Sequence, residues 1–202
     1  MNDWDAEVNG RVLVLVAHAD DESMAYGALL QRAKDPVVVI ATDGAPQDSY
    51  FWGRYGSREK YAAMRSDEAK RATGLAGVRE LVLLAESDAR LVDQRLFLNL
   101  SAAYALLEKI VERVRPETIA TLAYEGGHPD HDCCSLLGAL LGKKLGVPVW
   151  EAPLYHRAGG AGIDSAKADP EGSLRLQQFV EENGSEMLLK ITGEELKRKR
   201  AR

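Results

Sequence analysis

The sequence of this 202-residue chain alternates short apolar runs with longer segments of helical spacing. Two of the runs are rich in β-branched residues, 11–17 (RVLVLVA) and 37–42 (VVVIAT), and are typical of strands buried on both faces. Alternation of this kind favours a parallel sheet with helices on both sides. We therefore expect an α/β, Rossmann-like three-layer domain with a mostly parallel five-stranded sheet. Further strands are expected at 81–84, 118–122 and 147–152, and helices at about 22–34, 58–74, 94–115 and 131–145.

The C-terminal part of the chain has a different pattern. Apolar segments at 174–180 and 187–191 flank an Asn-Gly pair, whose residues tolerate the positive φ of a tight hairpin turn. Thr192 followed by Glu195 has the spacing of a capping box and predicts that a last helix begins there. We expect one domain over 1–202, with its core at 11–156 and a C-terminal hairpin and helix at 173–202.

Composition excludes several classes of protein. With 46% hydrophobic and 28% charged residues, the chain is close to globular averages, which excludes a disordered or collagen-like chain. No apolar run approaches the roughly 18–20 residues that span a bilayer, and no signal peptide is visible. The net charge of −5 gives no general attraction to nucleic acid, and the basic run at 197–202 is expected to be a solvated helix face.

The only two cysteines, Cys133 and Cys134, are adjacent. This excludes a disulfide scaffold and suits a reducing compartment, and small buried hydrophobes are the expected role. We therefore expect a cytoplasmic enzyme that acts on a small molecule, without a nucleic-acid partner or a membrane span. A homo-oligomer stays open.

The first apolar run leads directly into 18–23 (HADDES), which places one imidazole and three carboxylates within five residues. Ligands of parallel α/β sheets bind beyond the carboxyl ends of the strands. The turn lacks the glycine fingerprint of a dinucleotide site, and the chain lacks a phosphate-binding loop. Acidic residues also cap helices, but capping explains His18 poorly. For this segment alone, a helix cap and a functional site remain alternatives.

A second polar segment, 125–132 (EGGHPDHD), follows the fourth expected strand and holds two of the four histidines. Taken alone it also fits a polar loop that ends in a capping Asp130. Because both segments follow strand ends at the same edge of a parallel sheet, a catalytic metal site explains the pair better. Two histidines and one aspartate match the three protein ligands of many catalytic zinc sites, which keep a position for water. Spacing alone leaves open which aspartate is a ligand and which is a base.

The two segments resemble the AHPDDE and HPDH signatures of the LmbE-like (PIG-L) family of zinc-dependent N-acetylglucosaminyl de-N-acetylases. Weaker similarity continues through 42–44 (TDG) and 65–68 (RSDE), and the resemblance spans roughly residues 11–156. Ala19 stands where the family usually has proline, which loosens the turn without removing a reactive group. We expect function to survive this difference.

The resemblance implies a role for each matching residue. Asp20 would be the general base on metal-bound water, and Asp130 would orient a histidine. His128 would stabilise the oxyanion or donate a proton to the departing amine, and Arg65 would contact the substrate. The implied metal ligands are His18, Asp21 and His131.

Three further residues are candidates for substrate contact. Trp52 lies in an aromatic-rich segment with interleaved arginines, which fits either a lid over a sugar or a loop packed on the domain. Asp88 follows the third expected strand, where a turn residue is the alternative. His156 follows the fifth, where a structural histidine is the alternative.

The sequence thus predicts a metal-dependent amide hydrolase that removes an N-acetyl or other short acyl group from an amino sugar or its conjugate. Zn²⁺ is the expected ion, with Fe²⁺ or another divalent ion as the alternative. Two other classes stay open. One is a non-catalytic carbohydrate- or metal-binding module on the same fold, and the other is a metal-dependent phosphoesterase with the same ligands.

Overall fold

The computed structural model describes residues 10–154, 184–186, 189 and 191–200. Its sheet has five strands in the order β3-β2-β1-β4-β5, and every neighbouring pair is parallel. This confirms the predicted α/β fold. The strands are β1 (Val12–Val16), β2 (Val37–Ile40), β3 (Glu80–Leu83), β4 (Thr118–Leu122) and β5 (Val149–Ala152).

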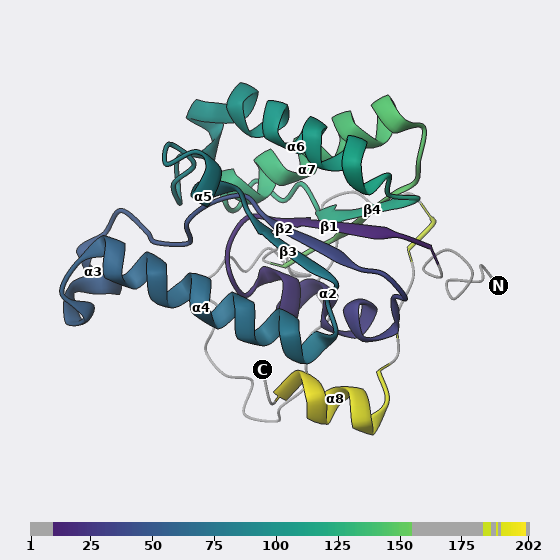
Figure 1. The fold of residues 1–202 in the computed structure, drawn as a ribbon, viewed down its shortest axis with the longest axis horizontal. Coiled ribbons are helices and arrows are strands. Elements are labelled where there is room, and N and C mark those ends of the chain that lie inside the picture. The colour runs from purple at the N-terminus through teal and green to yellow at the C-terminus, as the bar shows by residue number, and fades with distance from the viewer. Residues whose placement is uncertain (1–9, 155–183, 187–188, 190, 201–202) are drawn as a thin grey trace.

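Helices cover both faces of the sheet (Figure 1). One face carries α2 (Asp21–Arg32) and α4 (Arg58–Ala76), and the other carries α6 (Leu100–Val114) and α7 (Pro129–Leu145). None of the described helices has the length and apolar character needed to cross a membrane. The shorter elements are α3 (Ser49–Trp52), η1 (Gly53–Tyr55), α5 (Leu84–Ser87), η2 (Leu96–Asn99) and α8 (Gly193–Arg200).

The prediction of one continuous helix over 94–115 is wrong at its beginning. Gln94 has a φ of 65°, which lies outside the range of right-handed helices. The short helix η2 follows it, and the α-helix begins only at Leu100. The backbone N–H groups of Gln94 and Leu96 donate to the carboxylate of Asp130, at 2.6 and 3.0 Å. This contact with a distant residue holds the segment outside the helical pattern.

The core lies around the three central strands, in which every residue is buried. Helix α7 packs so closely on β4 that a Cβ at Gly138 would lie only 2.7 Å from Thr121 Cγ2. The hydroxyl of Thr121 lies 3.0 Å from the carbonyl oxygens of both Leu15 and Cys134, so it joins β1, β4 and α7. The close approach fixes the N-terminus of α7 beside the carboxyl end of β4.

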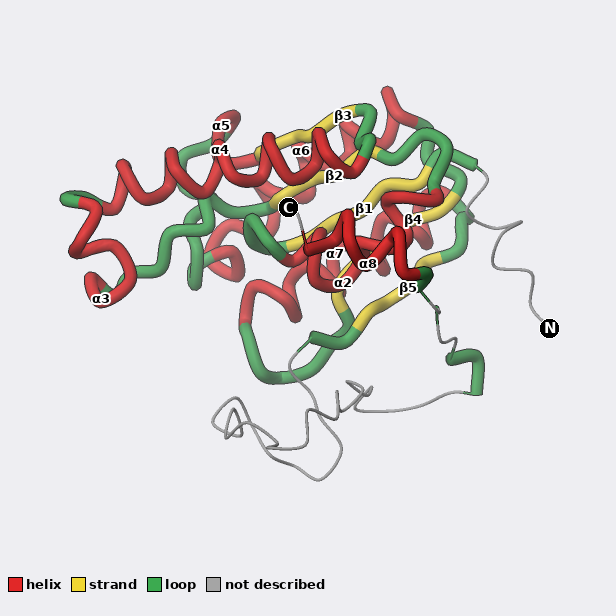
Figure 2. The backbone as a smooth tube through the Cα atoms, turned by 90° about the horizontal axis from the view of Figure 1, so that it is seen from below, coloured by secondary structure: helices red, strands yellow, loops and turns green. Residues whose placement is uncertain are grey.

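The order of the strands creates a switch point between β1 and β4. From β1 the chain continues through α2 to β2 on one side, and from β4 it continues through α7 to β5 on the other. Figure 2 shows β1 and β4 side by side. A crevice forms where neighbouring parallel strands lead their chains in opposite directions. Both polar segments singled out in the sequence begin there.

The predicted capping box of the last helix is confirmed. Thr192 N donates to Glu195 Oε2 at 2.6 Å, and Glu195 N donates to Thr192 Oγ1 at 3.3 Å. The same Glu195 forms an ion pair with Arg32 of α2, with Nε and Oε1 2.6 Å apart. Helix α8 therefore lies against α2 (Figure 2). The first strand of the predicted hairpin and most of the second lie outside the described residues.

Candidate metal centre and active site

The turn between β1 and α2 has an unusual backbone. Asp20, the residue before the helix, has a φ of 136°, which costs a residue with a side chain about 1–3 kcal/mol. Hydrogen bonds hold it there. Its N–H donates to Glu22 Oε2 at 2.9 Å, and its carbonyl oxygen accepts from the N–H groups of Ser23 and Met24. In this conformation the side chains of His18, Asp20 and Asp21 have different partners.

The second polar segment forms the N-terminus of α7. His128 is the capping residue, and its Nδ1 accepts a hydrogen bond from Asp130 N at 3.3 Å. Before it, the N–H groups of Glu125 and Gly126 donate to Asp132 Oδ1, at 3.0 and 3.1 Å. Pro129 begins the helix with its φ already fixed. The segment is thus folded back on itself, next to the end of β1.

The two predicted histidine ligands both lie close to one carboxylate oxygen of the third, Asp21. Asp21 Oδ2 lies 3.3 Å from His18 Nδ1 and 3.4 Å from His131 Nε2. All three residues are buried, with His131 completely so. The ring of His128 completes the group, with its centroid 4.6 Å from that of His18 and 4.9 Å from that of His131.

These residues fit a divalent cation. Nitrogen and oxygen ligands about 2.0–2.2 Å from one zinc ion lie within about 4.4 Å of each other, and both contacts of Asp21 satisfy this limit. Among the described residues, two groups have ligand atoms that all lie within 4.8 Å of one another: His18, His128 and His131, and His18, Asp93 and Asp130. The first group shares His18 and His131 with the predicted set, and Asp21 belongs to neither group. Imidazole and carboxylate donors suit zinc and iron(II) alike.

Opposite charges are concentrated in this buried site. Burial lowers the pKa of His18, but hydrogen bonds to Asp130, Asp21 and Asp93 outweigh it and raise the pKa well above its ordinary value. Burial raises the pKa of Asp21, but hydrogen bonds to His131 and His18 outweigh it and hold the pKa well below the ordinary value. Asp21 is therefore anionic, as a metal ligand must be.

Asp130 holds His18 on the side opposite Asp21. Its Oδ2 lies 3.3 Å from His18 Nε2, and the residue is completely buried. Burial raises the pKa of Asp130. The hydrogen bond to His18 and those from the backbone of Gln94 and Leu96 outweigh this effect and hold the pKa below its ordinary value. The carboxylate thus fixes the orientation of a predicted ligand and anchors the loop before η2.

Sequence reasoning missed Asp93. Its Oδ1 lies 3.2 Å from His18 Nε2, and its side chain is only 7% exposed. Its N–H donates to Asp43 Oδ1 at 3.0 Å, and Asp43 forms an ion pair with Arg58 at 2.7 Å. The available signal was that its loop follows β3 at the same edge of the sheet.

The candidate chosen from that loop, Asp88, has a local partner instead. It lies 2.6 Å from the guanidinium of Arg90 and accepts the backbone N–H of the same residue. Hydrogen bonds from Arg90 lower the pKa of Asp88 to about 2. This is the geometry of a charged turn, and contact with substrate stays a prediction.

The predicted base and a predicted substrate contact lie against each other. Asp20 Oδ2 is 2.7 Å from Arg65 Nη2, and Arg65 also donates to the carbonyl of Ala19. Burial and the nearby charge of Asp21 raise the pKa of Asp20, and Arg65 offsets part of this effect. The Asp20 side chain remains 52% exposed and lines a cleft of about 540 Å³ between α2, α4 and α8.

The remaining candidates lie apart from this group. Trp52 is half-buried in α3, and its indole Nε1 donates to the carbonyl of Pro46 at 3.1 Å. Its role stays a prediction, and His156 lies outside the described residues. Cys133 and Cys134 are buried, as expected, and burial raises the pKa of the Cys133 thiol to about 11. A protonated thiol is a poor metal ligand.

Comparisons with known proteins identify a matching family and similar sequences. The sequence profile described as "PIG-L: GlcNAc-PI de-N-acetylase" matches residues 13–140. The probable N-acetyl-alpha-D-glucosaminyl L-malate deacetylase 2 of Bacillus anthracis is 27% identical over 166 residues, which cover 79% of this chain and 70% of the relative.

Solved structures share the fold at low sequence identity. A deacetylase of the teicoplanin biosynthesis pathway, in complex with teicoplanin, is 16% identical with a TM-score of 0.67, over 95% of this chain and 84% of that one. The deacetylase of the A40926 pseudoaglycone is 22% identical with a TM-score of 0.55, and the match covers 70% of this chain but 62% of that one. The fold, the converging motifs and the profile match together show that the chain belongs to the PIG-L (GlcNAc-PI de-N-acetylase) family.

Proposed function

We propose that this chain is a metal-dependent N-deacetylase that removes an acetyl or other short acyl group from an amino sugar or its conjugate. The observation that carries the proposal is the meeting of Asp21 Oδ2 with the rings of His18 and His131 at the switch point of the sheet. Family membership supports the reaction class, and the relative named as a deacetylase of an N-acetylglucosaminyl malate supports the substrate class.

His18, Asp21 and His131 are the proposed ligands of the ion, with Zn²⁺ as the first candidate. A divalent ion bound there would polarise the acyl carbonyl and lower the pKa of a water molecule. The protein contributes the orientation of the ligands. Asp130 holds His18 through Nε2, which leaves Nδ1 on the side of Asp21, where it would be available as a ligand.

Asp20 is the proposed general base. It is adjacent to the ligand Asp21, and its carboxylate is accessible from the cleft. Its raised pKa makes it a stronger proton acceptor than an ordinary aspartate. Arg65 holds the carboxylate in place at 2.7 Å while it accepts the proton of the attacking water.

His128 is the proposed donor to the reacting groups. Its Nδ1 accepts the N–H of Asp130, so the neutral ring carries its proton on Nε2. Burial lowers the pKa of His128 below its ordinary value, which favours the neutral ring. The Nε2–H group is then available to stabilise the oxyanion or to protonate the departing nitrogen.

The test is a hydrolysis assay on the purified full chain. The protein is stripped with a chelator and titrated with Zn²⁺ or Fe²⁺, and release of free amine from N-acetylglucosamine and its methyl glycoside is measured. We expect turnover only with metal. Turnover should be lost in Asp20→Asn but kept in Asp35→Asn, which changes a partly exposed residue paired with Arg79. Phosphate release from a model ester without any amine release would instead favour a phosphoesterase. Metal binding without either reaction would favour a binding module.

A further inference from the structure

The histidine proposed as a metal ligand at the end of β1 faces two carboxylates on its far side. His18 Nε2 lies 3.3 Å from Asp130 Oδ2 and 3.2 Å from Asp93 Oδ1. Asp130 has further donors, the backbone N–H groups of Gln94 and Leu96. Asp93 Oδ1 is buried, and among the described residues no other donor reaches it. The imidazole of His18 is therefore the polar group against which this oxygen lies.

Two buried carboxylates in such a position repel each other. A carboxylate oxygen of Asp93 and one of Asp130 lie within 4.8 Å of each other, and the two side chains are only 7% and 0% exposed. Because little solvent surrounds them, the repulsion between their charges is weakly screened. Other contacts must therefore hold Asp93 beside His18.

Asp43 supplies one of these contacts, from the loop that follows β2. Its Oδ1 accepts the backbone N–H of Asp93 at 3.0 Å, and its own N–H donates to the carbonyl of Leu91 at 3.1 Å. Strand β2 lies between β3 and β1 in the sheet. The loop after β3 is thus fastened over the end of β2, and this brings Asp93 to His18 at the end of β1.

Arg58, the first residue of α4, fixes the carboxylate of Asp43 in turn. Its Nη1 and Nη2 donate to Asp43 Oδ2 and Oδ1 at 2.7 and 2.9 Å, and Nη2 also donates to the carbonyl of Ala45. Two parallel hydrogen bonds set the plane of a carboxylate as well as its position. Asp43 Oδ1 is therefore held toward the N–H of Asp93, and Arg58 is connected to the His18 ring through two side chains.

We propose, on the basis of the proposed metal centre, that Asp93 is a positioning residue for His18 and that the Arg58–Asp43 pair holds it in place. A carboxylate beside Nε2 fixes the orientation of the ring and makes Nδ1 a stronger ligand. Asp93 and Asp130 do this together, from two different loops. The Arg58–Asp43 pair thereby raises the metal affinity of the site without contributing a ligand to it.

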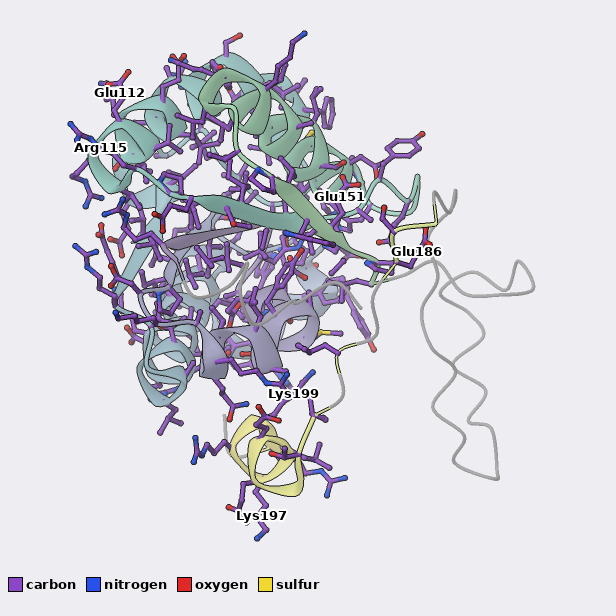
Figure 3. The ribbon with its side chains drawn as sticks, turned by 90° about the vertical axis from the view of Figure 1, so that its right-hand side faces the viewer. Glu112, Arg115, Glu151, Glu186, Lys197 and Lys199 are labelled. Atoms are coloured by element: carbon purple, nitrogen blue, oxygen red, sulfur yellow. The ribbon has the colours of Figure 1, made fainter. Side chains whose placement is uncertain are left out.

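The test measures metal affinity separately from turnover. Competition with a chromophoric chelator gives the Zn²⁺ affinity of the purified full chain, and the visible spectrum of bound Co²⁺ reports the geometry of the ligands. The variants are Asp93→Asn, which keeps the volume and removes the charge, Arg58→Gln, and the two combined. One control is Glu112→Gln, an exposed carboxylate that Figure 3 shows at the outer surface of α6. The other is Arg113→Gln, which breaks an ion pair with Glu80.

We expect Asp93→Asn to lower the Zn²⁺ affinity by about 10–100-fold and to change the Co²⁺ spectrum, with the fold retained by circular dichroism. Arg58→Gln should lower the affinity by about threefold or more. It should have no further effect in a chain that already carries Asp93→Asn, because its influence passes through Asp93. Both controls should bind metal as the wild type does.

An unchanged affinity and spectrum in Asp93→Asn overturns the inference, even when the wild type hydrolyses an N-acetyl amino sugar. If Asp93→Asn does not fold, an unchanged affinity in Arg58→Gln decides against the inference in the same way. Additive losses in the double variant overturn the role of Arg58. A greater loss in Asp93→Asn than in His131→Asn makes Asp93 a ligand and overturns its positioning role. A chain that binds metal without turnover, and binds it more weakly in Asp93→Asn, keeps the inference and overturns the deacetylase proposal.

Discussion

The carboxylate of Asp130, at the start of α7, lies 3.3 Å from His18 Nε2 at the end of β1 and fixes that ring from the side opposite Asp21. The same carboxylate accepts two backbone N–H groups of the loop before η2. One buried group thus ties together a proposed metal ligand, the switch point of the sheet and the loop that carries Asp93.

Asp130→Asn should therefore weaken metal binding without removing a proposed ligand. Loss of the anion beside a ligating histidine typically costs 10–100-fold in metal affinity. Competition with a chromophoric chelator measures the Zn²⁺ affinity, and Glu112→Gln, an exposed change on α6, is the control. An unchanged affinity in Asp130→Asn would remove this residue from the support of the site.

Glu22 should position the general base through the backbone. Glu22→Ala leaves the Asp20 N–H without its acceptor, so we expect unfolding free energy to fall by about 1–3 kcal/mol and kcat to fall while bound metal is retained. Glu22→Gln keeps an oxygen at this position and should recover much of the kcat. Denaturant unfolding, metal analysis and kinetics on both variants check this. Equal kcat losses in the two variants would contradict a backbone role.

The packing of α7 on β4 should tolerate no added methyl group. Gly138→Ala brings a Cβ to within 2.7 Å of Thr121 Cγ2, and such overpacking typically costs about 1–3 kcal/mol. Gly74→Ala is the matched control, because its added Cβ meets no atom within 4 Å and alanine is the better helix former. Chemical denaturation should show the first variant destabilised and the second unchanged or stabilised. Equal stabilities would contradict the close approach.

The attachment of α8 to α2 should weaken at acid pH. The ion pair with Arg32 and the hydrogen bond from Thr192 lower the pKa of Glu195 to about 2. A carboxylate whose pKa is lower in the folded chain stabilises the fold above its ordinary pKa of about 4.3, and this contribution is lost as the pH falls toward 2. An NMR titration of the Glu195 carboxyl should give a midpoint near 2 in the wild type and a higher one in Arg32→Gln. A wild-type midpoint near 4.3 would mean that the helix is not held by this pair.

Much of the fold could be predicted, because the β-branched runs of β1 and β2 are short, apolar and separated by segments of helical length. The beginning of α6 could not be predicted. Its preceding residues have acceptable helical spacing, and only the contact with Asp130 fixes Gln94 at a positive φ. Local patterns contain no information about such a contact.

The proposed ligands could be identified because two motifs carry their spacing in the sequence. Asp93 has no such motif, and its approach to His18 depends on how a loop after β3 folds over the edge of the sheet. The pairing of Arg65 with Asp20 depends likewise on the packing of α4 beside α2. The substrate contacts predicted for Trp52, Asp88 and His156 stay predictions.

The central claim is that His18, Asp21 and His131 hold one divalent ion. Metal content per chain, measured by elemental analysis after equilibrium dialysis against Zn²⁺, tests it most directly. We predict one ion per chain in the wild type and in Cys133→Ser, and a large loss in His131→Asn with the fold retained by circular dichroism. An unchanged metal content in a folded His131→Asn variant would contradict the account.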